Sequence, residues 1–209
     1  MNLLLLTFSI NNYNKYKNLD IIKQKSFITI YSKDRIKKVI LTINKINDIL
    51  KKKFNINIFN SNLKYLEICC GYGLSTIGLK LKKIIPLSID NNKEDLSIGF
   101  YFGFLNPKKT ICLDIQLLSY YLSKNYFDIC FGFMIGTIYK FNENNWKNIL
   151  FESIKSIKKN GLLILTVRKN IEINIISKWL IDLIKYPMII DNRDNTTEYD
   201  QWIYLGFKK

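Results

Sequence analysis

Two glycines separated by one residue are the first residues whose type and spacing could do chemistry. Gly71 and Gly73 follow the short apolar run Leu66–Cys70 and precede a segment with helical character. A backbone without a Cβ can turn tightly and approach a ligand, and the first amides of the next helix favour an anionic group. The sequence therefore predicts a ligand-binding loop between a strand and a helix. A side chain at Gly73 is expected to fill the space of the ligand.

Acidic residues end the next two apolar runs. Asp90 follows Ile84–Ile89 and stands about 20 positions after the loop, where a carboxylate can accept hydrogen bonds from both hydroxyls of a ribose. A helix cap is the alternative role for Asp90. Asp114 follows Thr110–Leu113 and is expected either at the same crevice or in an exposed turn.

Strand-like and helix-like segments alternate from residue 64 onward and would position these residues. Strands are expected over residues 65–70, 84–89, 110–113, 127–133, 162–167, 188–190 and 202–207. Helices are expected over residues 75–83, 96–104, 115–122, 145–158 (closed by Gly161 in the left-handed conformation) and 171–186 (ended by Pro187). This alternation is typical of parallel strands with crossover helices, and strands without a polar face fit a sheet covered on both sides. The fold class is α/β, a three-layer Rossmann-like arrangement whose seven-stranded sheet is mostly parallel with an antiparallel edge. Ligands bind such sheets beyond the carboxyl ends of the strands, where the loop, Asp90 and Asp114 would meet.

The first 60 residues are expected to form a basic extension ahead of a ligand-binding domain over residues 61–209. They carry twelve cations and three acids, a net charge of +9, whereas the rest of the chain carries +6. Between Ile36 and Leu50, apolar residues recur at three- and four-residue intervals, which predicts an amphipathic helix capped by Ser32 or Asp34. The opening run Leu3–Leu6 is expected to be a buried strand or a packed arm, not a secretory signal.

The net charge of +15 suggests a nucleic-acid partner, because clustered cations attract phosphates. The composition offers a second explanation. The chain has no alanine and only three arginines, while isoleucine, asparagine and lysine dominate, as expected of coding in an AT-rich genome. Part of the lysine excess can therefore be mutational drift on a solvated surface.

The cysteines do not form a pattern that predicts a metal site, and the hydropathy does not predict a membrane span. The four cysteines lie in apolar, strand-like contexts and lack metal-ligand spacing, and the chain has no histidine. They are expected to be core residues in a reducing compartment, so the protein is expected to be cytoplasmic. No uncharged apolar run approaches the roughly 18 residues that a membrane helix needs.

The run Glu67-Ile68-Cys69-Cys70-Gly71-Tyr72-Gly73, with Asp90 after it, resembles the cofactor loop of class I S-adenosylmethionine-dependent methyltransferases. The resemblance covers about residues 60–209, and the loop is most similar to that of the ubiquinone/menaquinone-biosynthesis type. It implies a methyltransferase fold, S-adenosyl-L-methionine as cofactor and S-adenosyl-L-homocysteine as product. A dinucleotide-binding GxGxxG loop fits less well, because Thr76 stands where its third glycine is required.

The resemblance also implies a role for individual residues. Glu67 and the Gly71–Gly73 loop would hold the methionine moiety, and Asp90 would bind the ribose. Asp114, together with the amide of Ile115, would bind the amino edge of the adenine. The remaining residues that the resemblance assigns to the cofactor site are Cys69, Tyr72, Asn91 and Phe131.

The reaction is expected to be a direct in-line displacement that depends on positioning and needs no metal. By the resemblance, the strand Phe127–Phe133 would run under the transferred methyl group, and residues 133–139 would line the acceptor pocket. A hydroxyl or ammonium acceptor must lose a proton. The candidates for that proton are a substrate group or Tyr139, Asp128 and Glu143, while Lys140 stands about where relatives often have histidine. No catalytic residue is assigned.

A small molecule is the leading candidate for the acceptor. The segment after residue 131 is apolar, has no NPPY-like motif for an exocyclic base amine and has no Pro-Cys pair for C5 methylation of pyrimidines. One alternative is an RNA methyltransferase that grips phosphates with its basic extension. The other is a non-catalytic binding subunit with a methyltransferase-like fold.

Overall fold

The structure, a computed structural model, describes residues 33–101, 103–133, 143–168, 170–193 and 202–209. The strands are β1 (Tyr65–Ile68), β2 (Leu87–Asp90), β3 (Thr110–Cys112), β4 (Phe127–Gly132), β5 (Ile157–Val167), β6 (Ile184–Asp191) and β7 (Trp202–Lys208). The α-helices are α3 (Lys33–Phe54), α4 (Leu74–Leu81), α5 (Lys93–Tyr101), α6 (Leu118–Tyr121), α7 (Glu143–Ser156) and α8 (Asn170–Leu180). Two short 3-10 helices, η1 (Pro107–Lys109) and η2 (Ile115–Leu117), flank β3.

The seven strands form one sheet in the order β3-β2-β1-β4-β5-β7-β6. The first five strands pair in parallel, and β7 runs antiparallel to both β5 and β6. The chain thus reverses its strand order at β1, which lies between β2 and β4. This arrangement confirms the predicted fold class, including its antiparallel edge.

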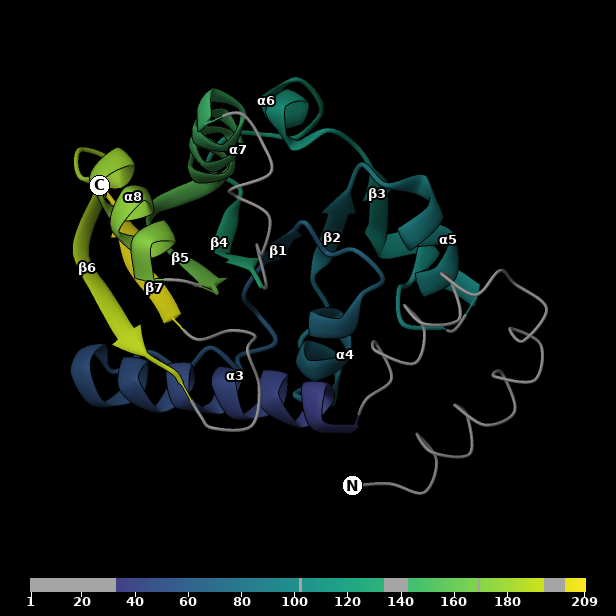
Figure 1. The fold of residues 1–209 in the computed structure, drawn as a ribbon, viewed down its shortest axis with the longest axis horizontal. Coiled ribbons are helices and arrows are strands. Elements are labelled where there is room, and N and C mark those ends of the chain that lie inside the picture. The colour runs from purple at the N-terminus through teal and green to yellow at the C-terminus, as the bar shows by residue number, and fades with distance from the viewer. Residues whose placement is uncertain (1–32, 102, 134–142, 169, 194–201) are drawn as a thin grey trace.

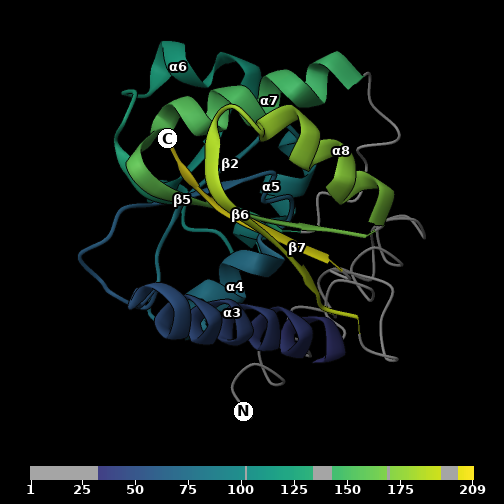
Figure 2. The ribbon, with the colours of Figure 1, turned by 90° about the vertical axis from the view of Figure 1, so that its left-hand side faces the viewer.

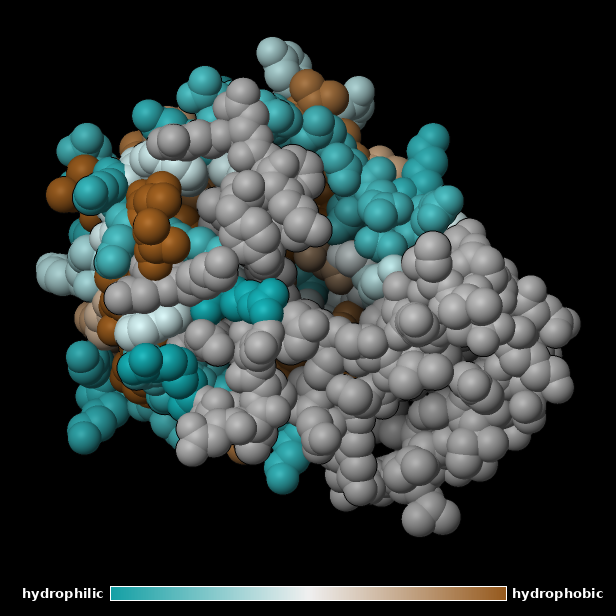
Figure 3. Space-filling view, viewed as in Figure 1, coloured by the Kyte–Doolittle hydropathy of each residue, from teal (hydrophilic) through white to brown (hydrophobic). Residues whose placement is uncertain are grey.

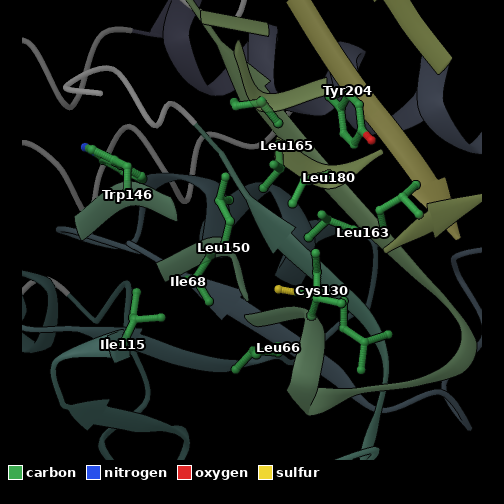
Figure 4. Packing of buried hydrophobic residues seen from close by; sticks show 14 of the residues in the cluster. Leu66, Ile68, Ile115, Cys130, Trp146, Leu150, Leu163, Leu165, Leu180 and Tyr204 are labelled. Carbon is green, nitrogen blue, oxygen red and sulfur yellow. The ribbon is translucent and has the colours of Figure 1, made fainter. Parts of the chain in front are cut away.

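Helices cover both faces of the sheet (Figures 1 and 2). On one face, α3 and α4 pack over a core that includes Ile43, Leu79, Ile129 and Phe131. On the other face, α7 and α8 pack over a core that runs from Leu66 in β1 to Tyr204 in β7 (Figure 4). The protein is therefore a three-layer sandwich in which the central strands have no solvated side.

The helix α3 confirms the predicted amphipathic helix. Val39, Ile43, Ile46 and Leu50 are buried at intervals of three and four residues, so one stripe of the helix faces the sheet. Next to this stripe, α4 crosses so closely that a Cβ at Gly78 would lie 2.5 Å from Val39 Cγ1. The described part of the extension is thus packed into the main core, and the boundary at residue 60 stays a prediction.

The predicted cap of α3 and the predicted packing of the run Leu3–Leu6 are not confirmed. Asp34 lies inside the first turn of α3 and is not its cap. The other proposed cap, Ser32, and the run Leu3–Leu6 lie outside the described residues.

The predicted helix over residues 171–186 is too long. Helix α8 ends at Leu180, and Ile184 already pairs with Lys208 of β7. The register of this pairing shifts between Lys185 and Met188, where Tyr186 has a positive φ of 51° and Pro187 follows. Pro187 therefore lies in a bulge of an edge strand, where its missing N–H does not interrupt a ladder. The pairing of β6 with β7, which local sequence does not encode, ends the helix early.

The predicted closure of α7 is also wrong in detail. The helix ends at Ser156, and β5 begins at Ile157 without an intervening loop. The residue with the left-handed conformation is Asn160, with a φ of 64°, and not Gly161. Gly161 is instead required by close packing, since a Cβ there would lie 2.4 Å from Ile157 Cγ2 and 2.8 Å from the carbonyl oxygen of Asp128.

The four cysteines are free thiols, but they do not share one environment. Cys70 and Cys130 are buried, Cys69 is half-buried and Cys112 is exposed. The prediction of four core cysteines is therefore wrong for Cys112, which is the last residue of the short edge strand β3. Among the described helices, none is long and apolar enough to span a membrane.

Candidate functional site

The carboxyl ends of β1, β2 and β4 meet at the reversal of strand order, on the side that Figure 1 turns toward the viewer. In open α/β sheets this is where ligands bind, because the loops leaving neighbouring strands diverge there. Figure 3 shows the surface hollowed near the middle of this face, over the region of β1 and β2. The predicted glycine loop follows β1 and so opens onto this edge.

The loop after β1 turns through three residues with positive φ. These angles are 53° at Cys69, 50° at Gly71 and 84° at Gly73. The space around the two glycines differs. Among the residues that the structure describes, a Cβ built on Gly71 meets no atom within 4 Å, whereas a Cβ on Gly73 would lie 2.5 Å from Leu105 Cδ2. Gly71 therefore borders open space, and Gly73 packs against the segment after α5.

This difference corrects one prediction. A side chain at Gly73 would collide with Leu105 and Phe104, not with a ligand. Gly73 is the N-cap of α4 and contributes no side chain, which leaves room at the first amides of that helix. The glycine whose side chain would enter the open space is Gly71.

Asp90 joins the tip of β2 to the glycine loop. Its Oδ2 accepts a hydrogen bond of 2.8 Å from the Gly71 amide, and its Oδ1 accepts one of 2.9 Å from the Asn92 amide. The helix cap of α5 is Asn92, whose Oδ1 accepts from the amides of Glu94 and Asp95. The capping role considered for Asp90 thus belongs to Asn92, and Asp90 is half-buried beside the loop.

Asp114 lies at the tip of β3, close to the same loop. Its Oδ1 accepts from the Gln116 amide at 3.0 Å and caps η2, while the amide of Leu113 donates to the Asp90 carbonyl oxygen at 3.0 Å. Burial, together with the negative charges of Asp90 and Asp114, raises the pKa of the Cys69 thiol to about 12. The tips of β1, β2 and β3 therefore converge around Cys69.

Glu67 lies beneath the loop and is fully buried. Its carboxylate accepts hydrogen bonds from the hydroxyls of Ser75 and Thr76 in α4 and, at 2.7 Å, from Ser88 in β2. Burial raises the pKa of Glu67 above its ordinary value, and the hydroxyl hydrogen bonds and Lys80 oppose that rise. Glu67 thus ties β1 to α4 and β2 and supports the loop from below.

No family model matches the chain, and no curated protein matches it by sequence. Solved structures resemble it at low identity. The first is an S-adenosylmethionine-dependent methyltransferase from Archaeoglobus fulgidus, with a TM-score of 0.53, 11% identity and coverage of 79% of this chain and 94% of that chain. An rRNA methylase from Streptococcus thermophilus gives a TM-score of 0.54 at 12% identity, over 79% of this chain and 95% of that chain. A magnesium protoporphyrin IX methyltransferase from Synechocystis, solved with bound cofactor, gives a TM-score of 0.57 at 12% identity, over 99% of this chain and 95% of that chain.

The chain has the fold of S-adenosylmethionine-dependent methyltransferases. The structural neighbours include enzymes named for both RNA and small-molecule substrates, so the methyltransferase fold alone does not select an acceptor.

The remaining residues predicted for the cofactor site differ in whether their side chains can reach a ligand. Tyr72 hydrogen-bonds the carboxyl of Asp95, and Asn91 is exposed beside Asp90. The side chain of Ile115 is buried in the core under α7. The Phe131 ring is also fully buried, stacked between the rings of Tyr65 and Phe133, with centroids 6.2 Å and 5.5 Å away. Phe131 can therefore support a cofactor only through its backbone or through Phe133.

Asp128 is misplaced as a candidate base. It lies near the amino end of β4, where its carboxylate accepts from the Lys64 amide at 2.8 Å and pairs with Lys158 at 2.6 Å. This is the edge of the sheet opposite the glycine loop. Tyr139 and Lys140 lie outside the described residues, and so does the side chain of Glu143.

Sequence reasoning missed the residues that hold the loop in shape. The hydroxyls of Ser75, Thr76 and Ser88 surround Glu67, and Leu105 fills the space behind Gly73. A usable signal was present for Ser88, a hydroxyl in an otherwise apolar strand beside a buried acid. Leu105 offered none, since an apolar residue after a helix has many possible partners.

Proposed function

We propose that this protein is an S-adenosylmethionine-dependent methyltransferase that methylates a small molecule. The observation that supports the proposal most is the hydrogen bond between the Gly71 amide and Asp90, with open space above Gly71. It joins a bare backbone turn to a carboxylate at the carboxyl edge of the sheet. The common fold with methyltransferases of known structure agrees with it.

The residues present fit an adenosyl cofactor. A carboxylate can accept about four hydrogen bonds, and the two oxygens of Asp90 each accept one from a backbone amide. Each oxygen keeps one acceptor position, which matches the two hydroxyls of a ribose. A Cβ at Gly71 would enter the open space that the ligand needs.

The other loop residues would complete the cofactor site. We propose that the first amides of α4 and the turn over Cys69–Gly73 hold the methionine moiety, and that Asp114 and the Ile115 amide hold the adenine. Tyr72, Asn91 and the backbone of Phe131 would border the site. When bound, the cofactor supplies an activated methyl group, so the chain needs only to orient the acceptor and exclude water.

Two lysines of α3 donate hydrogen bonds within the protein, which supports the small-molecule acceptor over RNA gripped by the extension. Lys38 is buried and donates to the Asn192 carbonyl oxygen at 2.7 Å, and Lys45 donates to the Asp191 carbonyl oxygen at 2.6 Å. These two ammonium groups fasten α3 to the end of β6, whereas Lys37, Lys51, Lys52 and Lys53 are exposed. The free thiols fit a reducing compartment, and we also propose a cytoplasmic location.

Calorimetric titration with S-adenosylmethionine and S-adenosylhomocysteine tests the proposal. Asp90→Ala removes two hydrogen bonds to a charged acceptor, each worth about 1.5–3 kcal/mol, so the dissociation constant should rise at least about 100-fold. Gly71→Val should weaken binding similarly by filling the open space. Asp182→Ala, which removes an exposed carboxylate beyond the end of α8, is the matched control and should bind normally.

Two outcomes would contradict the cofactor site. One is a folded wild-type protein that binds neither ligand, as expected of a non-catalytic subunit. The other is an Asp90→Ala variant with unchanged affinity. Binding without methyl transfer to any acceptor tested would keep the cofactor site and leave only the acceptor to be found.

A further inference from the structure

A cavity lies at the edge of the sheet opposite the glycine loop. It has a volume of about 660 Å³ and is lined by the amino ends of β1, β2 and β4, by β3 and by the end of α6. The glycine loop and Asp90 leave the carboxyl ends of the same strands. The cavity is therefore separate from the proposed cofactor site, and none of the residues assigned to that site lines it.

Three tyrosines, Tyr65, Tyr121 and Tyr126, are among the residues that line this cavity. Tyr65 is buried, and Tyr120 precedes Tyr121 in the chain. Tyr120 is 83% exposed, Tyr121 is 69% exposed and Tyr126 is 45% exposed. Several exposed rings at one place are unusual, because aromatic side chains normally bury most of their surface.

The charge of the cavity is positive. Lys64 and Lys109 line it, and among the described residues no carboxylate does. The Lys64 ammonium lies 3.8 Å from the centroid of the Tyr126 ring, so a cation and an aromatic face occupy one place. Asp128 at this edge accepts a hydrogen bond from the Lys64 amide at 2.8 Å, and its carboxylate is paired with Lys158 at 2.6 Å. Lys108 and Lys124, the chain neighbours of the lining residues Lys109 and Ser123, are also exposed.

We propose that this cavity, lined by Tyr121, Tyr126, Lys64 and Lys109, binds single-stranded RNA. Single strands bind where aromatic rings stack on unpaired bases and cations follow the phosphates, and this cavity is lined by both groups. A duplex would present phosphates but no base faces to the rings. The half-open shape and the lysines beyond the rim suit a continuous strand, because a free nucleotide would leave much of the cavity and its rim unused.

This inference does not depend on the proposed activity. RNA bound in this cavity would lie at the opposite edge of the sheet from the proposed cofactor site. Such binding would therefore not make RNA the methyl acceptor. RNA binding and cofactor binding can therefore fail separately.

Fluorescence anisotropy with a labelled 12-nucleotide oligo(U) tests the proposal on the full chain. Tyr121→Ala/Tyr126→Ala should raise the dissociation constant by about 5-fold to 150-fold for each stacked base lost. Tyr121→Phe/Tyr126→Phe keeps both rings and should bind within about 3-fold of the wild type. Tyr186→Ala removes a tyrosine with 64% exposure on β6, at the other end of the sheet, and is the control for aromatic loss.

The lysines give an independent readout. Lys64→Gln and Lys109→Gln should each reduce the dependence of log K on log salt concentration by about 0.7, the value for one phosphate contact on a single strand. Lys52→Gln on α3 removes one exposed charge elsewhere and should leave the slope unchanged.

Three results would overturn the proposal. The first is equal affinity for oligo(U) and a 12-base-pair duplex, which would indicate only charge attraction. The second is unchanged binding in the folded Tyr121→Ala/Tyr126→Ala variant, with folding checked by circular dichroism. The third is adenosine monophosphate binding as tightly as oligo(U), which would assign the cavity to a free nucleotide.

Discussion

The collision expected at Gly73 gives the sharpest test of the loop geometry. A Cβ at this position would lie 2.5 Å from Leu105 Cδ2, 2.8 Å from Leu105 Cγ and 3.3 Å from Phe104 Cβ. Leu105 is buried among Cys70, Leu96 and Phe100 and cannot move without disturbing them. Gly73→Ala should cost about 1–2 kcal/mol for the left-handed conformation and about 1–3 kcal/mol for overpacking. The sum is about 2–5 kcal/mol in the free energy of unfolding.

A double-variant cycle separates the two costs. Leu105→Ala alone should cost about 2–5 kcal/mol, but it removes the colliding atoms. Gly73→Ala/Leu105→Ala should therefore be more stable than the sum of the single variants by about 1–3 kcal/mol, which is the overpacking cost. Gly71→Ala is the matched control, because its φ of 50° carries the strain while no atom of the described residues lies within 4 Å of its Cβ. It should cost only about 1–2 kcal/mol and show no coupling to Leu105→Ala.

Urea denaturation of these four variants, of Gly71→Ala/Leu105→Ala and of the wild type measures these quantities. Additivity of Gly73→Ala and Leu105→Ala within about 0.5 kcal/mol would refute the packing explanation. So would a Gly73→Ala variant that is no less stable than Gly71→Ala. Cofactor titration adds a second distinction, since Gly71→Ala should weaken binding although its effect on stability is the smaller one.

Two further predictions concern buried polar groups. Burial raises the pKa of Glu67 above 4.5, so ionisation of this carboxyl disfavours the folded state. The free energy of unfolding of Glu67→Gln should therefore increase relative to that of the wild type as the pH rises from about 4.5 through the folded pKa. A stability difference that does not change between pH 4 and pH 8 would contradict this sign. Among the described side chains, the Tyr204 hydroxyl is buried without a hydrogen-bond partner, and burial raises its pKa to about 12. Tyr204→Phe should therefore leave the free energy of unfolding unchanged or raise it by about 1 kcal/mol, which thermal unfolding would detect as a Tm that does not fall.

Local patterns were sufficient to predict the framework of the fold. The spacing of apolar residues in α3 specifies a helix with one buried face, because a period of 3.6 residues leaves few alternatives. Short apolar runs that end in Gly71, Asp90 and Asp114 predict strand tips at one edge of a parallel sheet. These features act over a few residues, so a single sequence contains them.

Features that depend on distant partners could not be predicted in this way. Tyr186 and Pro187 belong to β6 because β7, some 20 residues later, pairs with that segment. The opposite surroundings of Gly71 and Gly73 depend on where Leu105 packs. The cavity lined by Tyr121, Tyr126 and Lys64 exists only because segments from four parts of the chain meet at one edge of the sheet.

The sequence by itself thus determined the α/β class, the position of the glycine loop and the carboxylate that follows it, because each depends on neighbours along the chain. Only the tertiary structure decided which glycine borders open space, that Glu67 supports the loop from below and that Asp128 lies at the wrong edge. The physical reason is that close packing between segments far apart in sequence sets which side chains are buried and what they contact. The type of a single residue does not contain that information.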